Sequence, residues 1–454
     1  MGSGLRRSAS ASNSRRQALD AAPDARISDI EGHHKQDGAA RLWWQASPGH
    51  ELQLEHREGR EDRWAGMRER SGLRRYFQSL TDINRSHSAV AWSADWGGEV
   101  AARSSLRAYG SHIAMHNSRS AGVAALRPHT LNDRVLDGQL SAEPSNSLLV
   151  TSGFELRREA LDNSGLPGGS GRAQHHALFG QLAYAATPTL ALTAGLRMDH
   201  HQRYGRAWSP RLYAVWRPAR ASPWVLKGGY GHGYKAPTLK QIAPGYQEDE
   251  GPNTFFSNPA IRAELNDALE LTLGYDTPAA GAQATVFNNR VHNLVVGRLT
   301  GTVAGRAQYL YDNVDCARFN GVELSARALL PAGFAVDAHY TNLEATDGLG
   351  QRLEKRPRHL LGLQLAWHTG PWRAGVRADH HAKQWIATTT VGQALQPLPD
   401  LTRVSAHLSH QLGAGLEATL GVDNLTRLHL AEESPLFTWA EAPRTWRLAL
   451  RGVW

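Results

Sequence analysis

The chain has 454 residues, a formal net charge of +8, a hydrophobic content of 41% and a single cysteine, Cys316. One cysteine excludes an intrachain disulfide and any metal site built from several cysteines. No apolar run approaches the roughly 18 to 20 residues that a membrane-spanning helix requires. The basic residues are spread along the chain rather than gathered in one patch, which argues against nucleic acid as a partner. Two interpretations of the many arginines stay open: a codon-biased genome, or an arginine-lined interior with loops that meet anionic ligands or lipid phosphates.

The first part of the chain, residues 1–37, is poorly patterned. It predicts at most one early strand near residues 5–14 and a loop near residues 21–38. From residue 38 to residue 454, apolar and polar residues alternate with the period of two that is typical of β-strands. We therefore predict a short N-terminal segment, 1–37, followed by one β-domain that covers residues 38–454.

Short and long connections alternate between the predicted strands. Turns rich in Pro, Gly, Asn and Asp lie at residues 47–49, 95–98, 144–146, 187–188, 218–223, 278–281, 331–333, 370–371 and 413–415. Long polar segments lie near residues 60–85, 111–133, 159–173, 234–265, 292–308, 344–357, 382–399 and 425–443, with a shorter one near 201–207. The turns recur about every 46 residues, so that each repeat contains two strands, one turn and one long loop.

This pattern is typical of an all-β fold, the transmembrane antiparallel β-barrel. Such a barrel has short turns at the end that faces the cell interior and long loops at the end that faces outwards. We predict about 19 strands, with residues 5–14 as a possible twentieth. Soluble β-propellers have repeats of similar length, but each of their blades needs four strands, whereas each repeat here has two. A soluble all-β binding protein such as a propeller is the alternative.

The longest polar segment separates strands predicted at Trp224–Pro237 and Ala268–Asp276. In both, apolar and polar residues alternate, so one face of each strand is apolar and the other polar. The glycines of residues 228–233 fall inside the first strand. At such a position glycine relieves crowding or bends the backbone rather than binding phosphate.

The sequence contains none of the motifs of zinc proteases, nucleotide-binding loops or serine hydrolases. Adjacent histidines occur at residues 33–34, 175–176, 200–201 and 380–381. Neighbours on a strand point to opposite faces, so such a pair cannot readily chelate one ion. We therefore predict no catalytic residues and no metal site.

Aromatic and basic residues in and beside the long loops are better candidates for ligand contacts, because arginine binds anionic groups and aromatic rings offer flat faces. The predicted ligand-binding residues are Arg75, Tyr76, Tyr234, Lys235, Tyr246, Phe255, Arg298, Tyr309 and Trp385. The competing interpretation is that these side chains pack the loops together or form the aromatic belt at the membrane surface.

Several segments resemble the barrel of TonB-dependent outer-membrane receptors, in particular the ferric-siderophore group that includes the enterobactin and colicin I receptors. They are GYGHGYKAPTLKQ (229–241), NPAIRAELNDALELTLGYD (258–276), FNNRVHNLV (287–295), YDNVDCARFNGVELSA (311–326), WSPRLYAVW (208–216), the triplet Asp423-Asn424-Leu425 and the terminal Trp454. The resemblance covers residues 38–454. Ala263-Glu264 departs from the family's usual Pro-Glu, and Pro443-Arg444 departs from its usual Gly-Arg.

The resemblance implies a receptor of the bacterial outer membrane with a barrel of about 22 strands. It implies a transporter rather than an enzyme, which binds a ferric siderophore, is energised by the TonB–ExbB–ExbD system and contacts outer-membrane lipid. It also implies no cofactor, since iron is bound only within the siderophore. Family members begin with a signal peptide, a TonB box and a plug domain. We recognise none of these here, and we therefore expect an N-terminally truncated form that does not transport alone.

The family's haem receptors tend to carry a histidine between the two boxes. Residues 237–258 contain no histidine, which favours a ferric siderophore over haem. A haem receptor or another TonB-dependent receptor remains an alternative.

Overall fold

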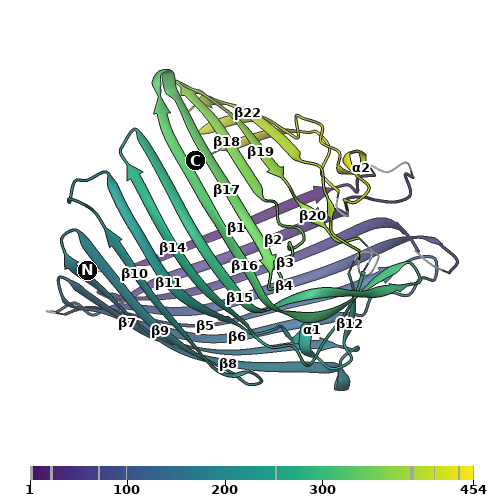
Figure 1. The fold of residues 1–454 in the computed structure, drawn as a ribbon, viewed down its shortest axis with the longest axis horizontal. Helices are drawn as coiled ribbons and strands as arrows, with labels where there is room; N and C mark the ends of the chain where they lie inside the picture. Colours follow the sequence, from purple (N-terminus) through teal and green to yellow (C-terminus); the bar gives the residue numbers. More distant parts are fainter. Residues whose placement is uncertain are drawn as a thin grey trace.

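The computed structural model describes residues 4–20, 24–69, 72–98, 100–250, 253–388, 393–413, 415–437 and 440–452. Over these ranges the chain is almost entirely β-structure, with 22 strands joined in one sheet. Figure 1 shows the strands running side by side, tilted, in a strongly curved sheet. No helix among the described residues is long and apolar enough to cross a membrane.

The main sheet contains β1 Leu5–Arg16, β2 Gly32–Ser47, β3 His50–Arg68, β4 Tyr76–Asp95, β5 Ala101–Arg119, β6 His129–Ser145, β7 Leu148–Asn163, β8 Ser170–Thr187, β9 Leu190–His201, β10 Gly205–Trp216, β11 Trp224–Lys235, β12 Gln247–Glu250, β13 Asn253–Phe256, β14 Glu264–Asp276, β15 Ala280–Val303, β16 Arg306–Leu330, β17 Phe334–Asp347, β18 His359–Thr369, β19 Trp372–Ala382, β22 Leu401–Gly413, β23 Leu416–Asp423 and β24 Thr445–Gly452. The connections contain helices α1 Leu239–Ile242 and α2 Leu430–Glu433, 3-10 turns η1 Pro167–Gly169 and η2 Pro331–Gly333, and a separate pair, β20 Trp385–Ile386 with β21 Gln396–Pro397.

Two of the sheet's strands, β12 and β13, are four-residue strands inside the loop between β11 and β14. The other strands of this sheet follow one another as antiparallel neighbours, and β11 pairs directly with β14 across that loop. The predicted antiparallel barrel sheet is confirmed, including the early strand: β1 pairs with β2 over its whole length. A propeller is excluded because one continuous sheet replaces separate four-stranded blades. The domain boundary placed at residues 37 and 38 stays a prediction, and it falls inside β2.

The loops are shorter than the sequence predicts because the strands continue beyond the apolar pattern as polar hairpins. The clearest correction concerns residues 292–308, which we expected to form a loop. There β15 and β16 run on to a two-residue turn, Ala304–Gly305, with φ values of 51° and 76°. Positive φ at both positions suits the twist of a tight hairpin.

The two faces of the sheet differ as a membrane barrel requires. On β14, Leu269, Leu271 and Leu273 are 58%, 50% and 48% exposed on the outer face. Thr272 points to the other face, is buried, and its hydroxyl lies 2.8 Å from that of Thr285 on β15. An exposed apolar face outside and a polar face inside is the arrangement of a transmembrane β-barrel.

The glycines of 228–233 lie inside β11, as predicted. A Cβ added at Gly229 would overlap the ring of Tyr213 and would lie 2.6 Å from the carbonyl oxygen of Leu212. Glycine is therefore needed there for close packing against β10.

Candidate ligand-binding site

The inner face of the barrel carries a series of arginine–carboxylate pairs. They are Arg41–Glu55 at 3.0 Å, Arg107–Asp137 at 3.0 Å, Arg157–Asp133 at 2.6 Å, Arg197–Asp199 at 2.9 Å and Arg377–Asp379 at 2.8 Å. Because side chains alternate along a strand, these residues share the face opposite the exposed leucines. The wall is thus rich in arginine, yet each of these charges has a carboxylate partner.

The individual pairs were not predicted, although two of them have a simple sequence signal. Arg197 and Asp199, like Arg377 and Asp379, stand two residues apart on one strand, so both side chains point to the same face. The remaining pairs join neighbouring strands and depend on the register of the sheet, which a single sequence does not give.

The long β11–β14 connection, which contains α1 and β12, lies at the end of the barrel where the long loops are (Figure 1). Leu239 of α1, Ala243 and Tyr246 pack against Leu161 of β7 and Leu166 in one buried cluster. The ion pair between Nζ of Lys240 and Oε1 of Glu248, at 2.7 Å, joins α1 to β12. This connection is therefore a folded element rather than a free loop.

Tyr246, one of the predicted contact residues, lies inside this cluster and is only 3% exposed. Burial raises the pKa of its hydroxyl. In the present structure its ring stabilises the loop, and a ligand would reach it only after a rearrangement.

An aromatic stack stands beside this loop. The ring of Phe255 on β13 stacks on Tyr309 of β16 at a centroid distance of 5.1 Å and on Tyr311 at 5.6 Å. The stack forms because β13 pairs in parallel with β16. Arg306 fixes the same junction: its Nη2 donates to the carbonyl oxygen of Asn253 at 2.8 Å.

Three other predicted basic and aromatic residues lie on the neighbouring strand ends. Nε of Arg298 donates to Oδ2 of Asp312 at 2.7 Å, across the β15–β16 hairpin. Nζ of Lys235 lies 2.7 Å from Oε2 of Glu264. The neighbouring Tyr234 has a buried hydroxyl for which the described part of the chain offers no hydrogen-bond partner.

Arg75 and Tyr76 lie where the β3–β4 loop meets β4. Arg75 donates from Nε and Nη2 to the carboxylate of Glu69, both at 2.8 Å, and from Nη1 to the carbonyl oxygen of Ala121. Hydrogen bonds from Arg75 lower the pKa of Glu69 to about 2. The hydroxyl of Tyr76 donates to Asp24 at 2.6 Å. Both residues therefore tie loops together.

Trp385, the remaining predicted residue, is part of the short strand β20. The guanidinium of Arg352 lies 4.2 Å from the centre of its ring. Of the nine predicted residues, the structure thus brings Phe255 and Tyr309 into direct ring contact and distributes the others over the loop end of the barrel. Their roles in ligand binding remain predictions.

The described residues contain no group of three or more His, Cys, Asp or Glu that could hold a metal ion. Adjacent histidines point to opposite faces, as expected. His175 lies 2.9 Å from Asp199 on the inner face, whereas His176 faces His200 on the outer face.

Residues 15–425 match the family model "TonB dependent receptor-like, beta-barrel". An iron-regulated outer membrane virulence protein of Vibrio cholerae is 28% identical over 382 residues, which are 79% of this chain and 55% of that protein. A ferric enterobactin receptor of Pseudomonas aeruginosa is 25% identical over 463 residues, 87% of this chain and 61% of that protein. The chain thus spans just over half the length of these relatives.

The fold is shared with solved structures. A mutant of the Pseudomonas aeruginosa ferric enterobactin receptor, crystallised in complex with enterobactin, superimposes with a TM-score of 0.77 at 20% identity, covering 94% of this chain and 71% of that one. The order of the strands and the apolar outer face agree with the family match, which covers most of the chain. The chain belongs to the β-barrel family of TonB-dependent receptors, and it is a protein of the bacterial outer membrane.

Proposed function

We propose that the protein takes part in the uptake of a ferric siderophore, energised by the TonB–ExbB–ExbD system, and that it acts as a receptor rather than an enzyme. The observation that carries the proposal is the stack of Phe255, Tyr309 and Tyr311 at the loop end of an arginine-lined barrel. A ferric siderophore with aromatic iron ligands is both anionic and flat-faced. Such a ligand suits aromatic stacking together with charge-assisted hydrogen bonds from arginine.

The family match and the names of the relatives support this ligand class, since a curated relative is named for ferric enterobactin and a structural neighbour was crystallised with enterobactin. Arg298 and Arg306 flank the stack, and both presently bind protein oxygens. An anionic ligand would compete with Asp312 for Arg298. It would then bind a guanidinium on a side chain that is only about half exposed.

Ligand binding by the detergent-solubilised protein tests the proposal. Quenching of tryptophan fluorescence by ferric enterobactin would be measured for the wild type and for Phe255→Ala/Tyr309→Ala. Each aromatic contact contributes about 0.5–1.5 kcal/mol, so we expect the double variant to bind about tenfold more weakly. Phe334→Ala is the matched control, because Phe334 contacts Trp367 at the end of the barrel with the short turns.

Two further probes separate the alternatives. Iron-free siderophore should bind the wild type weakly. Haemin should bind the wild type no better than it binds the double variant. Tight haemin binding that depends on Phe255 and Tyr309 would favour the haem-receptor alternative. In cells that carry the native receptor, deletion of TonB should abolish uptake of siderophore-bound iron and leave binding at the cell surface unchanged.

A further inference from the structure

Two arginines on the outer wall of the barrel have no anionic partner. Arg134 of β6 and Arg158 of β7 occupy directly opposite positions of the paired strands, and both are exposed. Within the described chain, neither guanidinium makes a hydrogen bond or an ion pair. Like charges placed opposite each other in a sheet are destabilising. The pair therefore calls for an anion from outside the protein.

The inner face of the same strands shows the contrast. Arg157, next to Arg158 in sequence, points inwards and binds Asp133 at 2.6 Å. Arg107 on β5 likewise binds Asp137 at 3.0 Å. These two inward-facing arginines have carboxylate partners, whereas the described chain offers none to Arg134 and Arg158 on the membrane side.

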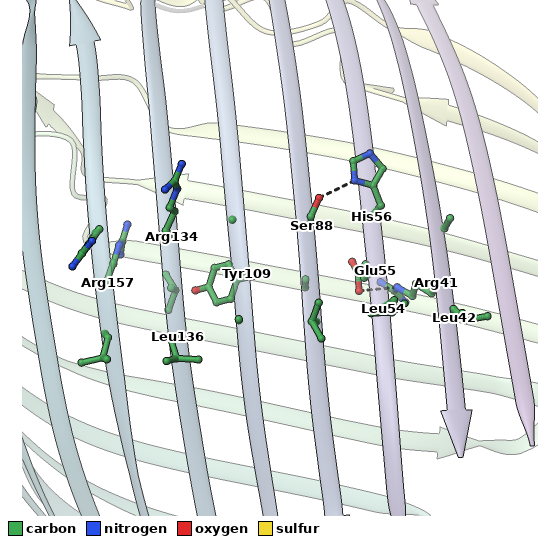
Figure 2. Close-up of a pocket in the computed structure, with 18 of the residues that line it drawn as sticks. Arg41, Leu42, Leu54, Glu55, His56, Ser88, Tyr109, Arg134, Leu136 and Arg157 are labelled. Atoms are coloured by element: carbon green, nitrogen blue, oxygen red, sulfur yellow. Dashed lines mark hydrogen bonds and ion pairs between the residues drawn. The ribbon is translucent and has the colours of Figure 1, made fainter. Parts of the chain in front are cut away.

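The pair stands at the upper limit of the apolar outer surface. Leu136 and Leu156 are the next outward residues on the same two strands, on the side of the short turns, and they too lie opposite each other. Figure 2 shows the same change along β3, where His56 lies above Leu54, and along β6, where Arg134 lies above Leu136. Because the long loops lie outside the cell, this boundary is at the level of the headgroups of the outer leaflet.

A groove runs along the outer surface below and beside the two arginines. Its volume is about 1390 Å³, and small residues such as Ser88, Ala108 and Gly110 contribute to its floor. Leucine and valine side chains line the side towards the membrane interior, with Arg7 and His176 at its two ends. At the polar side, Nδ1 of His56 lies 2.9 Å from Oγ of Ser88. On β3 the outward residue one step further from the membrane than His56 is Glu58.

We propose that this groove, the Arg134/Arg158 groove, binds a phosphorylated glycolipid of the outer leaflet. The two guanidinium groups bind a phosphate of the headgroup, because paired arginines match phosphate geometry with charge-assisted hydrogen bonds. An acyl chain lies over the small residues, against Leu54, Val90 and Leu136. The site is independent of siderophore binding, since it is on the outer wall and the aromatic stack is at the loop end.

The test is lipid binding by the full chain in detergent, measured by native mass spectrometry with purified lipid A carrying two phosphates. The variant Arg134→Gln/Arg158→Gln removes the phosphate contacts. With about one kcal/mol for each basic residue near a lipid headgroup, we expect binding to weaken about thirtyfold. Lipid A without its phosphates should bind the wild type about as weakly as intact lipid A binds the variant.

The control variant is Arg290→Gln/Arg318→Gln. These arginines are also exposed and directly opposite each other, on β15 and β16, but they do not line the groove. The same charge is removed, and binding should stay within about twofold of the wild type. Equal weakening in both double variants would overturn the proposal, because it would show attraction to net charge alone.

Two more measurements keep the test decisive if a double variant fails to fold, as judged by heat-modifiable gel mobility. Ala108→Phe keeps every charge and fills the groove, and it should weaken lipid binding severalfold. Inorganic phosphate should not displace the lipid at matching concentrations. Unchanged binding to Ala108→Phe, or displacement by phosphate alone, would contradict a lipid site and leave only a surface anion site.

Discussion

The β11–β14 connection is held down by Leu161, which makes this side chain the sharpest test of the loop structure. Leu161 is 0% exposed and lies beneath Leu239, Ala243 and Tyr246. Substitution of a fully buried leucine by alanine costs about 3 kcal/mol through lost burial and the remaining cavity. If that free energy stabilises only the docked loop, its opening equilibrium rises about 150-fold.

Hydrogen exchange of residues 239–246, followed by mass spectrometry in detergent, measures this opening directly. We expect Leu161→Ala to accelerate exchange of these amides about 150-fold and to leave the strands of the barrel unchanged. Leu212→Ala is the control, because Leu212 is 60% exposed on the apolar outer face of β10. Exchange that stays at the wild-type rate in Leu161→Ala, or that rises equally in Leu212→Ala, would refute the docked loop.

Two further predictions concern the β3–β4 loop and β11. Arg75→Gln should raise the pKa of Glu69 from about 2 towards its ordinary value of 4.5, because two of the three hydrogen bonds to the carboxylate come from the guanidinium. A lowered folded-state pKa stabilises the loop above pH 4.5, and this contribution disappears as the pH falls towards 2. NMR titration of labelled glutamate measures the rise in the Glu69 pKa. Arg75→Lys keeps the positive charge, so the rise should be absent in that variant only if the geometry of the guanidinium plays no part. Gly229→Ala should lower stability by about 1–3 kcal/mol through overpacking, whereas Gly231→Ala, with no atom within 4 Å of the added Cβ, should have little effect; the temperature at which gel mobility changes compares the two.

Much of the architecture could be predicted from the sequence because a barrel strand has a strict period. Alternation predicted strands at Trp224–Pro237 and Ala268–Asp276, and the structure has them at Trp224–Lys235 and Glu264–Asp276. The recurring turns indicated how the strands follow one another. The lengths of the polar hairpins could not be predicted, since residues beyond the lipid surface have no apolar stripe. The β15–β16 hairpin is the example: its tip lies at Ala304–Gly305, inside the segment expected as a loop.

The candidate site was predictable only in part, because it depends on contacts between distant segments. The pattern of residue types identified Phe255 and Tyr309 as aromatics in or beside loops, but the stack exists because β13 pairs in parallel with β16. Tyr246 looks equally available in the sequence, yet Leu161 and Leu166 bury it. The opposition of Arg134 and Arg158 likewise follows from strand register alone.

The Asp423-Asn424-Leu425 triplet shows how a segment chosen by resemblance acquires a physical reason. Asn424 is 2% exposed and has a φ of 53°, a conformation that asparagine tolerates better than most residues. Its side-chain amide donates to the carbonyl oxygens of Leu428 and Ala442, both at 2.9 Å. The residue therefore closes the β23–β24 loop at both of its ends.

The pairing of the first and last strands decides on which side of the membrane a fused peptide would stand. Leu5 of β1 lies opposite Trp44, close to the turn between β2 and β3, and Gly452 of β24 lies opposite Leu416, close to the turn between β22 and β23. Both outermost strands thus begin or finish beside short turns, on the periplasmic side. An epitope tag joined to either strand would be hidden from antibodies added to intact cells, whereas the Ala304–Gly305 turn would display the same tag to the medium.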